Sequence, residues 1–188
     1  ESFKLGNVIK NGIPITLVGN PNSGKSTLLN KILKEERAIV SEIKGTTRDT
    51  IEEVITINGY KFKFIDTAGL RDTKNKIEKI GISKTYQKIS ESAFILYMID
   101  KSNFNKQAIQ KEIIKIQEKT ESKESIVIIA NKNDINNELI SFEKIKELDI
   151  INISAKNGTG IQNILNHLVK KITKWGDINN DIIILNHR

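Results

Sequence analysis

Residues Gly19 to Ser26 read GNPNSGKS and match the phosphate-binding pattern G-x-x-x-x-G-K-[ST]. The glycines let the backbone curl so that several N–H groups point at phosphate oxygens, and a following helix adds its positive dipole end. Lys25 would supply a charge to the β- and γ-phosphates, and Ser26 a hydroxyl to Mg²⁺. The apolar run Ile13 to Val18 precedes the motif and the helical pattern Ser26 to Leu33 follows it. The motif therefore predicts a nucleoside triphosphate, without saying which one.

A second polar segment indicates the base. Asn131 to Asp134 reads NKND and directly follows the apolar run Ile126 to Ala130. Guanine presents two donors, N1–H and an exocyclic amine, and the Asp134 carboxylate can accept from both, whereas adenine offers no such pair. Because a wrong base would leave polar groups unpaired, discrimination can reach roughly 10⁴-fold. Behind a phosphate loop, this segment favours GTP over ATP, since an ATPase interpretation requires ignoring Asp134.

Neighbouring residues complete the predicted base site. We expect Asn131 to tie loops together and the stem of Lys132 to cover the base face. Ser154-Ala155-Lys156 follows the next predicted strand, and the Ala155 N–H can reach the guanine O6. Taken alone, either NKND or Ser154-Ala155-Lys156 could be an ordinary surface loop. The prediction of a guanine site depends on their order in the chain after the phosphate loop.

Two further segments are candidates for nucleotide-sensing loops. Gly45 to Thr50, GTTRDT, lies in a long connection of the kind that is usually functional. Within it, Thr47 is the candidate for the second hydroxyl on Mg²⁺. Asp66 to Gly69, DTAG, closes a predicted strand; Asp66 would hold Mg²⁺ through water and the Gly69 N–H would touch the γ-phosphate. Such loops are ordered by the γ-phosphate and released on hydrolysis.

The hydrolytic residues are less evident. Many GTPases of this kind place a water-orienting Gln directly after D-x-x-G, but this chain has Leu70 there. Either hydrolysis is poor or another residue orients the water, and the acidic candidates are Asp72 and Glu78. Arg48 and Arg71 are candidates for an arginine finger, although we favour the interpretation that both are solvated charges on loops.

Alternating apolar runs and helical patterns predict an α/β fold in three layers, with a six-stranded, mostly parallel sheet. Asn58-Gly59 predicts a hairpin that adds one antiparallel strand. The expected strands are 13–18, 53–57, 61–65, 94–99, 126–130 and 150–153. The expected helices are 26–33, 77–90, 106–120, 141–148 and 161–175.

Composition limits the class of protein. The 188 residues suit one domain, and the absence of cysteine excludes disulfides and thiolate metal sites. The longest apolar run is far too short for a membrane span, and no leader pattern opens the chain, so we expect a cytoplasmic location. A net charge of +7 allows nucleic-acid contact. However, the lysines are scattered beside many isoleucines and asparagines, which favours genome base composition as the cause of the excess charge. Because the chain starts with Glu1, we expect a piece of a longer protein.

These motifs resemble the Era-like bacterial P-loop GTPases with a Ras-like fold. The match is closest to the tRNA-modification GTPases of the MnmE (TrmE) family and spans the whole chain. The segments that carry the resemblance are Gly19 to Asn30, Ala38 to Asp49, Asp66 to Arg71 and Glu78 to Ile82.

The resemblance implies a cation-dependent chemistry. In the family a potassium ion takes over the arginine-finger role, and its ligands map onto Asn22, Ser41, Ile43 (through its carbonyl) and Thr46. Glu78 maps onto the family's catalytic glutamate, which acts with Lys25 and Thr47. Potassium also drives the pairing of two G domains in a homodimer. The implied nucleotide-binding residues are Asn22, Ser23, Gly24, Lys25, Ser26, Thr27, Ser41, Thr46, Thr47, Asp66, Thr67, Ala68, Gly69, Asn131, Lys132, Asp134, Ser154, Ala155 and Lys156.

The resemblance also implies the domain plan and the partners. Residues 13–175 would form the GTPase domain, with 1–12 and 176–188 as flanks joining a helical domain. In the intact protein, the flavin-dependent partner MnmG and tRNA would take part in modifying the wobble uridine. Two alternatives remain at this point. One is the ribosome-assembly GTPase Der, which shares GTTRD and DTAGLR, and the other is a non-hydrolysing nucleotide-dependent scaffold, which Leu70 favours.

Overall fold

The computed structural model describes residues 12–36, 51–66, 78–120, 125–138, 140–142, 145 and 147–179. The strands are β1 (Ile13–Gly19), β2 (Ile51–Ile57), β3 (Tyr60–Asp66), β4 (Phe94–Asp100), β5 (Ile126–Asn131) and β6 (Asp149–Asn152). The helices within these ranges are α2 (Lys25–Glu36), α3 (Glu78–Glu91), α4 (Lys106–Gln117) and α5 (Ile161–Asn179). None of these described helices is both long enough and apolar enough to cross a membrane.

The six strands form one sheet in the order β2-β3-β1-β4-β5-β6. β1 lies at its centre, parallel to β3 and β4, and β5 and β6 continue the parallel part. Only β2 runs antiparallel to its neighbour β3. Asn58 and Gly59 form the turn between these two strands with φ of 48° and 84°, as a two-residue hairpin turn requires. The predicted fold class and hairpin are confirmed.

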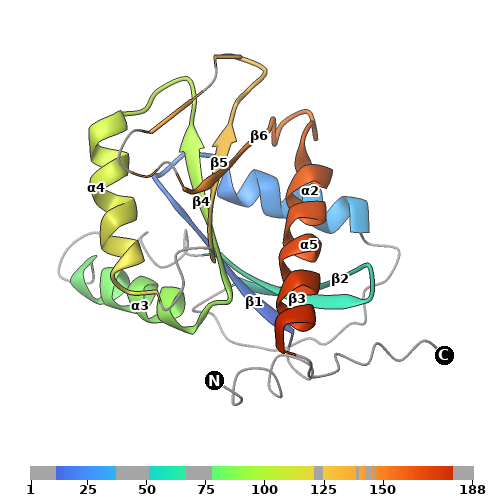
Figure 1. Ribbon diagram of the computed structural model, residues 1–188. Helices are drawn as coiled ribbons and strands as arrows, with labels where there is room; N and C mark the ends of the chain where they lie inside the picture. The colour runs from blue at the N-terminus through green and yellow to red at the C-terminus, as the bar shows by residue number, and fades with distance from the viewer. Residues whose placement is uncertain are drawn as a thin grey trace.

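Helices cover both faces of the sheet (Figure 1), with α2 and α5 on one side and α3 and α4 on the other. β4 shows why both faces are apolar. Phe94, Leu96 and Met98 belong to the core under α2 and α5, whereas Ile95, Tyr97 and Ile99 belong to the core under α3 and α4. Successive side chains of a strand point to opposite faces, so a strand buried on both faces is continuously apolar.

The helix expected over residues 141–148 is not found. The described residues of this segment form coil and turns. Phe142, Ile145 and Leu148 are nevertheless buried in the core under α3 and α4. Their spacing of three resembles a helical stripe, but so short a helix gains little stability from its own hydrogen bonds. The described residues bury these three side chains without forming a helix, so the predicted helix was wrong.

The five parallel strands end at one edge of the sheet, and this edge collects the polar motifs. The phosphate loop follows β1, and the polar segments 101–105, 131–136 and 153–156 follow β4, β5 and β6. Register places Gly19 beside Met98, and Asp100 beside Asn131. In parallel α/β sheets, ligands bind outside the carboxyl ends of the strands.

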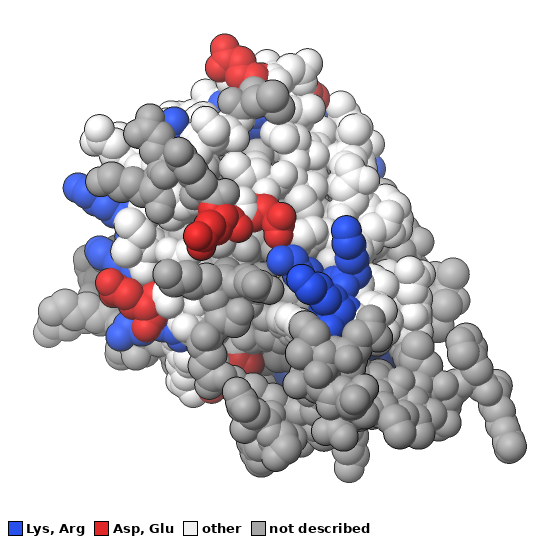
Figure 2. All heavy atoms as spheres, in the orientation of Figure 1, with Lys and Arg blue, Asp and Glu red and all other residues white. Residues whose placement is uncertain are grey.

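On the face drawn in Figure 2, the charges of the described residues are mixed rather than gathered in one basic area. On the described part of the face in Figure 2, acidic side chains lie between groups of basic ones. A nucleic-acid footprint would place Lys and Arg together on one face or along one helix. On this face the described surface fits the interpretation that the excess of lysine reflects composition.

Candidate nucleotide-binding site

The phosphate loop leaves β1 through a backbone that only particular residues accept. Gly19 has φ of 140°, and a Cβ there would lie 2.3 Å from the Met98 carbonyl oxygen of β4. Asn22 has φ of 62° and Gly24 has φ of 102°. Asn is among the few non-glycine residues that tolerate this left-handed region. The loop geometry therefore depends on these three residue types at these positions.

Lys25 is held by the loop itself. It is 6 % exposed, and its Nζ donates to the carbonyl oxygens of Gly19 (3.0 Å) and Asn20 (2.9 Å). These bonds fix the ammonium charge inside the curve of the loop. Ser26 and Thr27 are exposed in the first turn of α2. The positive end of the helix dipole adds to the charge of Lys25, which makes the loop an anion-binding site.

Asn131 joins three loops. Its side chain is almost fully buried, and Nδ2 donates to the Ser23 carbonyl oxygen at 2.7 Å while Oδ1 accepts from the Ala155 N–H at 2.9 Å. A Cβ at Gly24 would lie 2.2 Å from this Nδ2, so the close approach requires glycine. These are the contacts expected of a residue that ties loops together. The Ala155 N–H, which we expected to reach guanine O6, is thus engaged within the protein, and donation to a base requires this bond to be shared or exchanged.

Asp134 is exposed at the edge of the site, and its neighbours lower its pKa further. The hydrogen bond from the Ser154 hydroxyl lowers the pKa of Asp134, and the charges of Lys156 and Lys132 add smaller effects in the same direction. Ser154 is 2 % exposed, and its Oγ accepts from the Asn157 N–H at 3.2 Å. Both carboxylate oxygens of Asp134 can therefore accept at neutral pH. We did not predict that Ser154 would act on Asp134, because the sequence does not show that the two loops meet.

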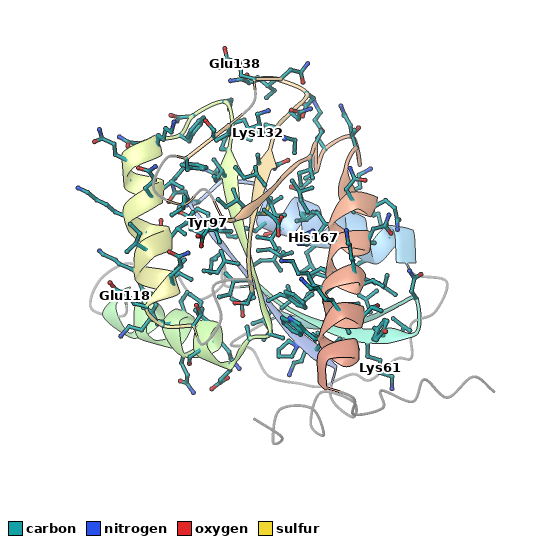
Figure 3. The ribbon with its side chains drawn as sticks, viewed as in Figure 1. Lys61, Tyr97, Glu118, Lys132, Glu138 and His167 are labelled. Carbon is teal, nitrogen blue, oxygen red and sulfur yellow. The ribbon has the colours of Figure 1, made fainter. Side chains whose placement is uncertain are left out.

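Lys132 turns from the loop toward β4. It has φ of 66°, and its Nζ donates to Asp100 Oδ2, near the upper end of the sheet in Figure 3. Burial raises the pKa of Asp100, but hydrogen bonds from Lys132 and Ser102 outweigh this effect and the pKa is lowered. Sequence reasoning missed Asp100. The sequence signal that could have identified Asp100 is the same as for Asn131, namely a polar residue at the end of a buried strand.

Two of the predicted catalytic and metal-binding positions are described only in their backbone. Asp66 ends β3, where register places it beside Leu17 of β1, and Glu78 is the first residue of α3. The remaining predicted positions lie outside the described residues. They are Ser41, Ile43, Thr46, Thr47, Arg48, Thr67, Ala68, Gly69, Leu70, Arg71 and Asp72.

A cavity of about 210 Å³ lies between the phosphate loop, β4 and the start of α4. Its lining includes Asn20, Asn22, Asp100, Phe104 and Ile109. Sites for small organic ligands usually measure about 300 to 1,000 Å³. This cavity is too small for a nucleoside triphosphate, so the open strand edge described above remains the candidate site.

Comparison with known proteins agrees with this geometry. The family model described as "50S ribosome-binding GTPase" matches residues 14–132, which include the phosphate loop and the start of the NKND segment. The chain belongs to this GTPase family. The domain is therefore a P-loop GTPase that binds guanine nucleotide and hydrolyses GTP.

The GTPase domain is similar over its whole length to tRNA modification GTPases named MnmE. It is 45 % identical to that of Christiangramia forsetii and 46 % identical to that of Flavobacterium psychrophilum. The matches include all of this chain but only 43 % and 41 % of those proteins, so the chain spans about two fifths of their length. The resemblance inferred from the motifs is confirmed. Among solved structures, Era of Aquifex aeolicus bound to GDP·AlF₄⁻ matches with a TM-score of 0.60 and 27 % identity, over 84 % of this chain and 56 % of Era.

Proposed function

We propose that this domain is the G domain of a GTPase that modifies the wobble uridine of tRNA, and that its GTP hydrolysis depends on potassium and on pairing of two G domains. The observation that carries the proposal is the sequence identity of 45–46 % over the whole chain to MnmE proteins, which are tRNA modification GTPases. In the intact protein, tRNA and the flavin-dependent partner MnmG would take part, and the location would be cytoplasmic.

The described residues fit a guanine nucleotide with Mg²⁺. The phosphate loop offers a fixed ammonium on Lys25 and an exposed Ser26 at the start of α2. The strand that ends with Asp66 lies directly beside the strand that ends at the loop. Hydroxyl and carboxylate oxygens suit Mg²⁺, which keeps several waters and takes few protein ligands. Thr47 is proposed as the other hydroxyl ligand.

Asn22 fits a monovalent cation site. It is exposed in the turn of the phosphate loop and has a left-handed backbone. Ser41, Ile43 and Thr46 are proposed as the other ligands of potassium. When bound, the ion supplies positive charge where the transferring phosphoryl group develops negative charge, the term that dominates such catalysis. Glu78, at the start of α3, is proposed to orient the attacking water, since Leu70 cannot.

The test is GTP turnover in KCl and in NaCl at matched ionic strength, each at low and high protein concentration. We expect turnover only in KCl, rising more than linearly with protein concentration. Asn22→Gly removes the amide and tolerates the positive φ at this position, so this variant should lose the preference for KCl. Asn20→Ala is the matched control. Its carbonyl oxygen, which accepts from Lys25, is retained, so the preference for KCl should persist.

Equal turnover in both salts would contradict the potassium mechanism and would leave an ordinary switch GTPase. Absence of turnover in both salts, with GTP still bound, would favour the non-hydrolysing scaffold that Leu70 suggests. Turnover in KCl that stays proportional to protein concentration would contradict the dimer while keeping the cation. A Der-like role in ribosome assembly would require association with ribosomal particles, which sedimentation of the intact protein measures.

A further inference from the structure

Lys101 is a buried cation at the edge of the sheet that carries the nucleotide site. It is the first residue after β4 and is only 2 % exposed. Its Nζ donates to Asn133 Oδ1 at 2.7 Å and to Asn152 Oδ1 at 3.1 Å. An ammonium group has donors only, so both amides must turn their oxygens toward it. A buried charge is tolerated only when it is hydrogen bonded, and these two bonds join the loop after β5 to the end of β6.

The backbone of Lys101 contacts the same loop at two more points. Its N–H donates to the Asn131 carbonyl oxygen at 3.0 Å, and its own carbonyl oxygen accepts from Asn136 Nδ2 at 3.3 Å. One residue therefore contacts the beginning, the middle and the end of the 131–136 turn. The Asn133 N–H donates to the Ile153 carbonyl oxygen at 3.0 Å, so the turn and the segment after β6 are also joined directly.

The two amides bound by Lys101 stand next to the residues that would read the base. Asn133 immediately precedes Asp134, and Asn152 lies two residues before Ser154. Ser154 in turn donates to the Asp134 carboxylate. A shift between the two segments would change both the position of Asp134 and its hydrogen bond.

We propose that Lys101 is a positioning residue for guanine specificity, which it sets by holding the 131–136 turn against the end of β6. The inference rests on the proposed recognition of guanine by Asp134 and adds a residue that touches no nucleotide. Burial lowers the pKa of Lys101, and the nearby charge of Glu138 opposes this shift. Glu138 lies at the outer end of the same loop in Figure 3, above Lys132. The charge of Glu138 favours the protonated, donating form that the two amide contacts require, against the larger effect of burial.

Lys101→Met tests the role because methionine fills similar buried space without charge or donors. Affinities for GDP, IDP, ADP and inorganic pyrophosphate would be measured by calorimetry on the wild type and the variant. IDP lacks the exocyclic amine and so can use only one donor toward Asp134. We expect the variant to bind GDP about tenfold more weakly, to lose part of its preference for GDP over IDP, and to bind pyrophosphate within twofold of the wild type.

Lys171→Met is the matched control. Lys171 pairs with Asp149 at 3.1 Å on α5 and β6, away from the turn. This variant should keep the wild-type preference for GDP over IDP. Asn152→Ala removes one acceptor of Lys101 and leaves the lysine in place, so it should reduce the same preference and carries the test if Lys101→Met does not fold.

The outcomes separate the inference from the function on which it rests. An unchanged preference for GDP over IDP in Lys101→Met and Asn152→Ala would overturn the positioning role while leaving guanine specificity intact. Equal weakening of GDP and pyrophosphate would also overturn it, because that result indicates a general loss of structure. A wild type that binds ADP as well as GDP would overturn guanine recognition itself, and the inference with it.

Discussion

Removing the side chain of Asn131 tests the structure of the site most directly. The side chain is 3 % exposed and makes two buried hydrogen bonds, from Nδ2 to the Ser23 carbonyl oxygen and from the Ala155 N–H to Oδ1. Asn131→Ala removes both bonds and leaves a buried carbonyl and a buried N–H without these partners. The loops after β1, β5 and β6 then lose the side chain that joins them.

The expected loss follows from these two groups. Leaving one buried polar group unsatisfied costs about 1–3 kcal/mol, so two groups set an upper range of about 2–6 kcal/mol. The space left by the amide is polar, and a water entering it would satisfy part of the deficit. We therefore expect the free energy of unfolding to fall by about 2–4 kcal/mol in the absence of nucleotide.

Urea unfolding of nucleotide-free protein measures this loss. The m-value should stay constant, because the surface exposed on unfolding hardly changes. Asn103→Ala is the control, since Asn103 is exposed and its removal should change stability by less than about 0.5 kcal/mol. Asn131→Asp keeps the acceptor for the Ala155 N–H but sets an oxygen against the Ser23 carbonyl oxygen, so it should destabilise at least as much as alanine. A loss below about 1 kcal/mol for both Asn131 variants would refute the reasoning.

Two further predictions concern charge. Asp134→Asn replaces one acceptor oxygen by a donor, so GTP affinity should fall by at least tenfold. The variant should instead favour XTP, whose C2 carries an oxygen in place of the amine. An unchanged choice of nucleotide in competition binding would contradict the role of Asp134. Burial lowers the pKa of His167 on α5 below its usual 6.5, so on acidification the unfolded state takes up the proton first. Stability that is present above pH 6.5 should therefore be lost as the pH falls toward the pKa of the folded state. The His167→Gln variant should show a flatter pH dependence in urea unfolding between pH 7.5 and 5.5, and equal slopes for the two proteins would show that His167 does not titrate as stated.

The sequence predicts most of this fold because strands buried on both faces have a distinct pattern. Ile126 to Ala130 is continuously apolar and Ile13 to Val18 is apolar except for the buried Thr16, and the two strands end one residue later, at Asn131 and Gly19. The segment 141–148 is less specific: we predicted a helix there, whereas its described residues form coil and turns that bury Phe142, Ile145 and Leu148. A local sequence pattern identifies a helix or a strand only when it excludes the other kinds of secondary structure.

Recognisable motif spacing predicts only part of the candidate site. The phosphate loop and the NKND segment are each a continuous stretch of sequence, so the residues of each motif could be read directly. The contacts of Asp100 with Lys132 and of Lys101 with Asn133 could not be read directly, because each joins residues 32 positions apart. Those contacts follow from the register that sets Asp100 beside Asn131, and only the assembled sheet fixes that register.

The distribution of buried polar groups shows how the same edge serves stability and specificity. Ser23, Lys25, Lys101, Asn131 and Ser154 are buried at the carboxyl ends of the strands, whereas the other buried polar residues of the described part are Thr16, Thr85 and Ser125. A buried polar group is costly unless it is paired, so its partners must be fixed by folding. The ends of β1, β4, β5 and β6 are therefore held in one arrangement before a nucleotide arrives. If Asp134 reads the base as proposed, a base whose donors do not match Asp134 would have to shift these fixed groups, so the pairing that stabilises the fold would also reject the wrong base.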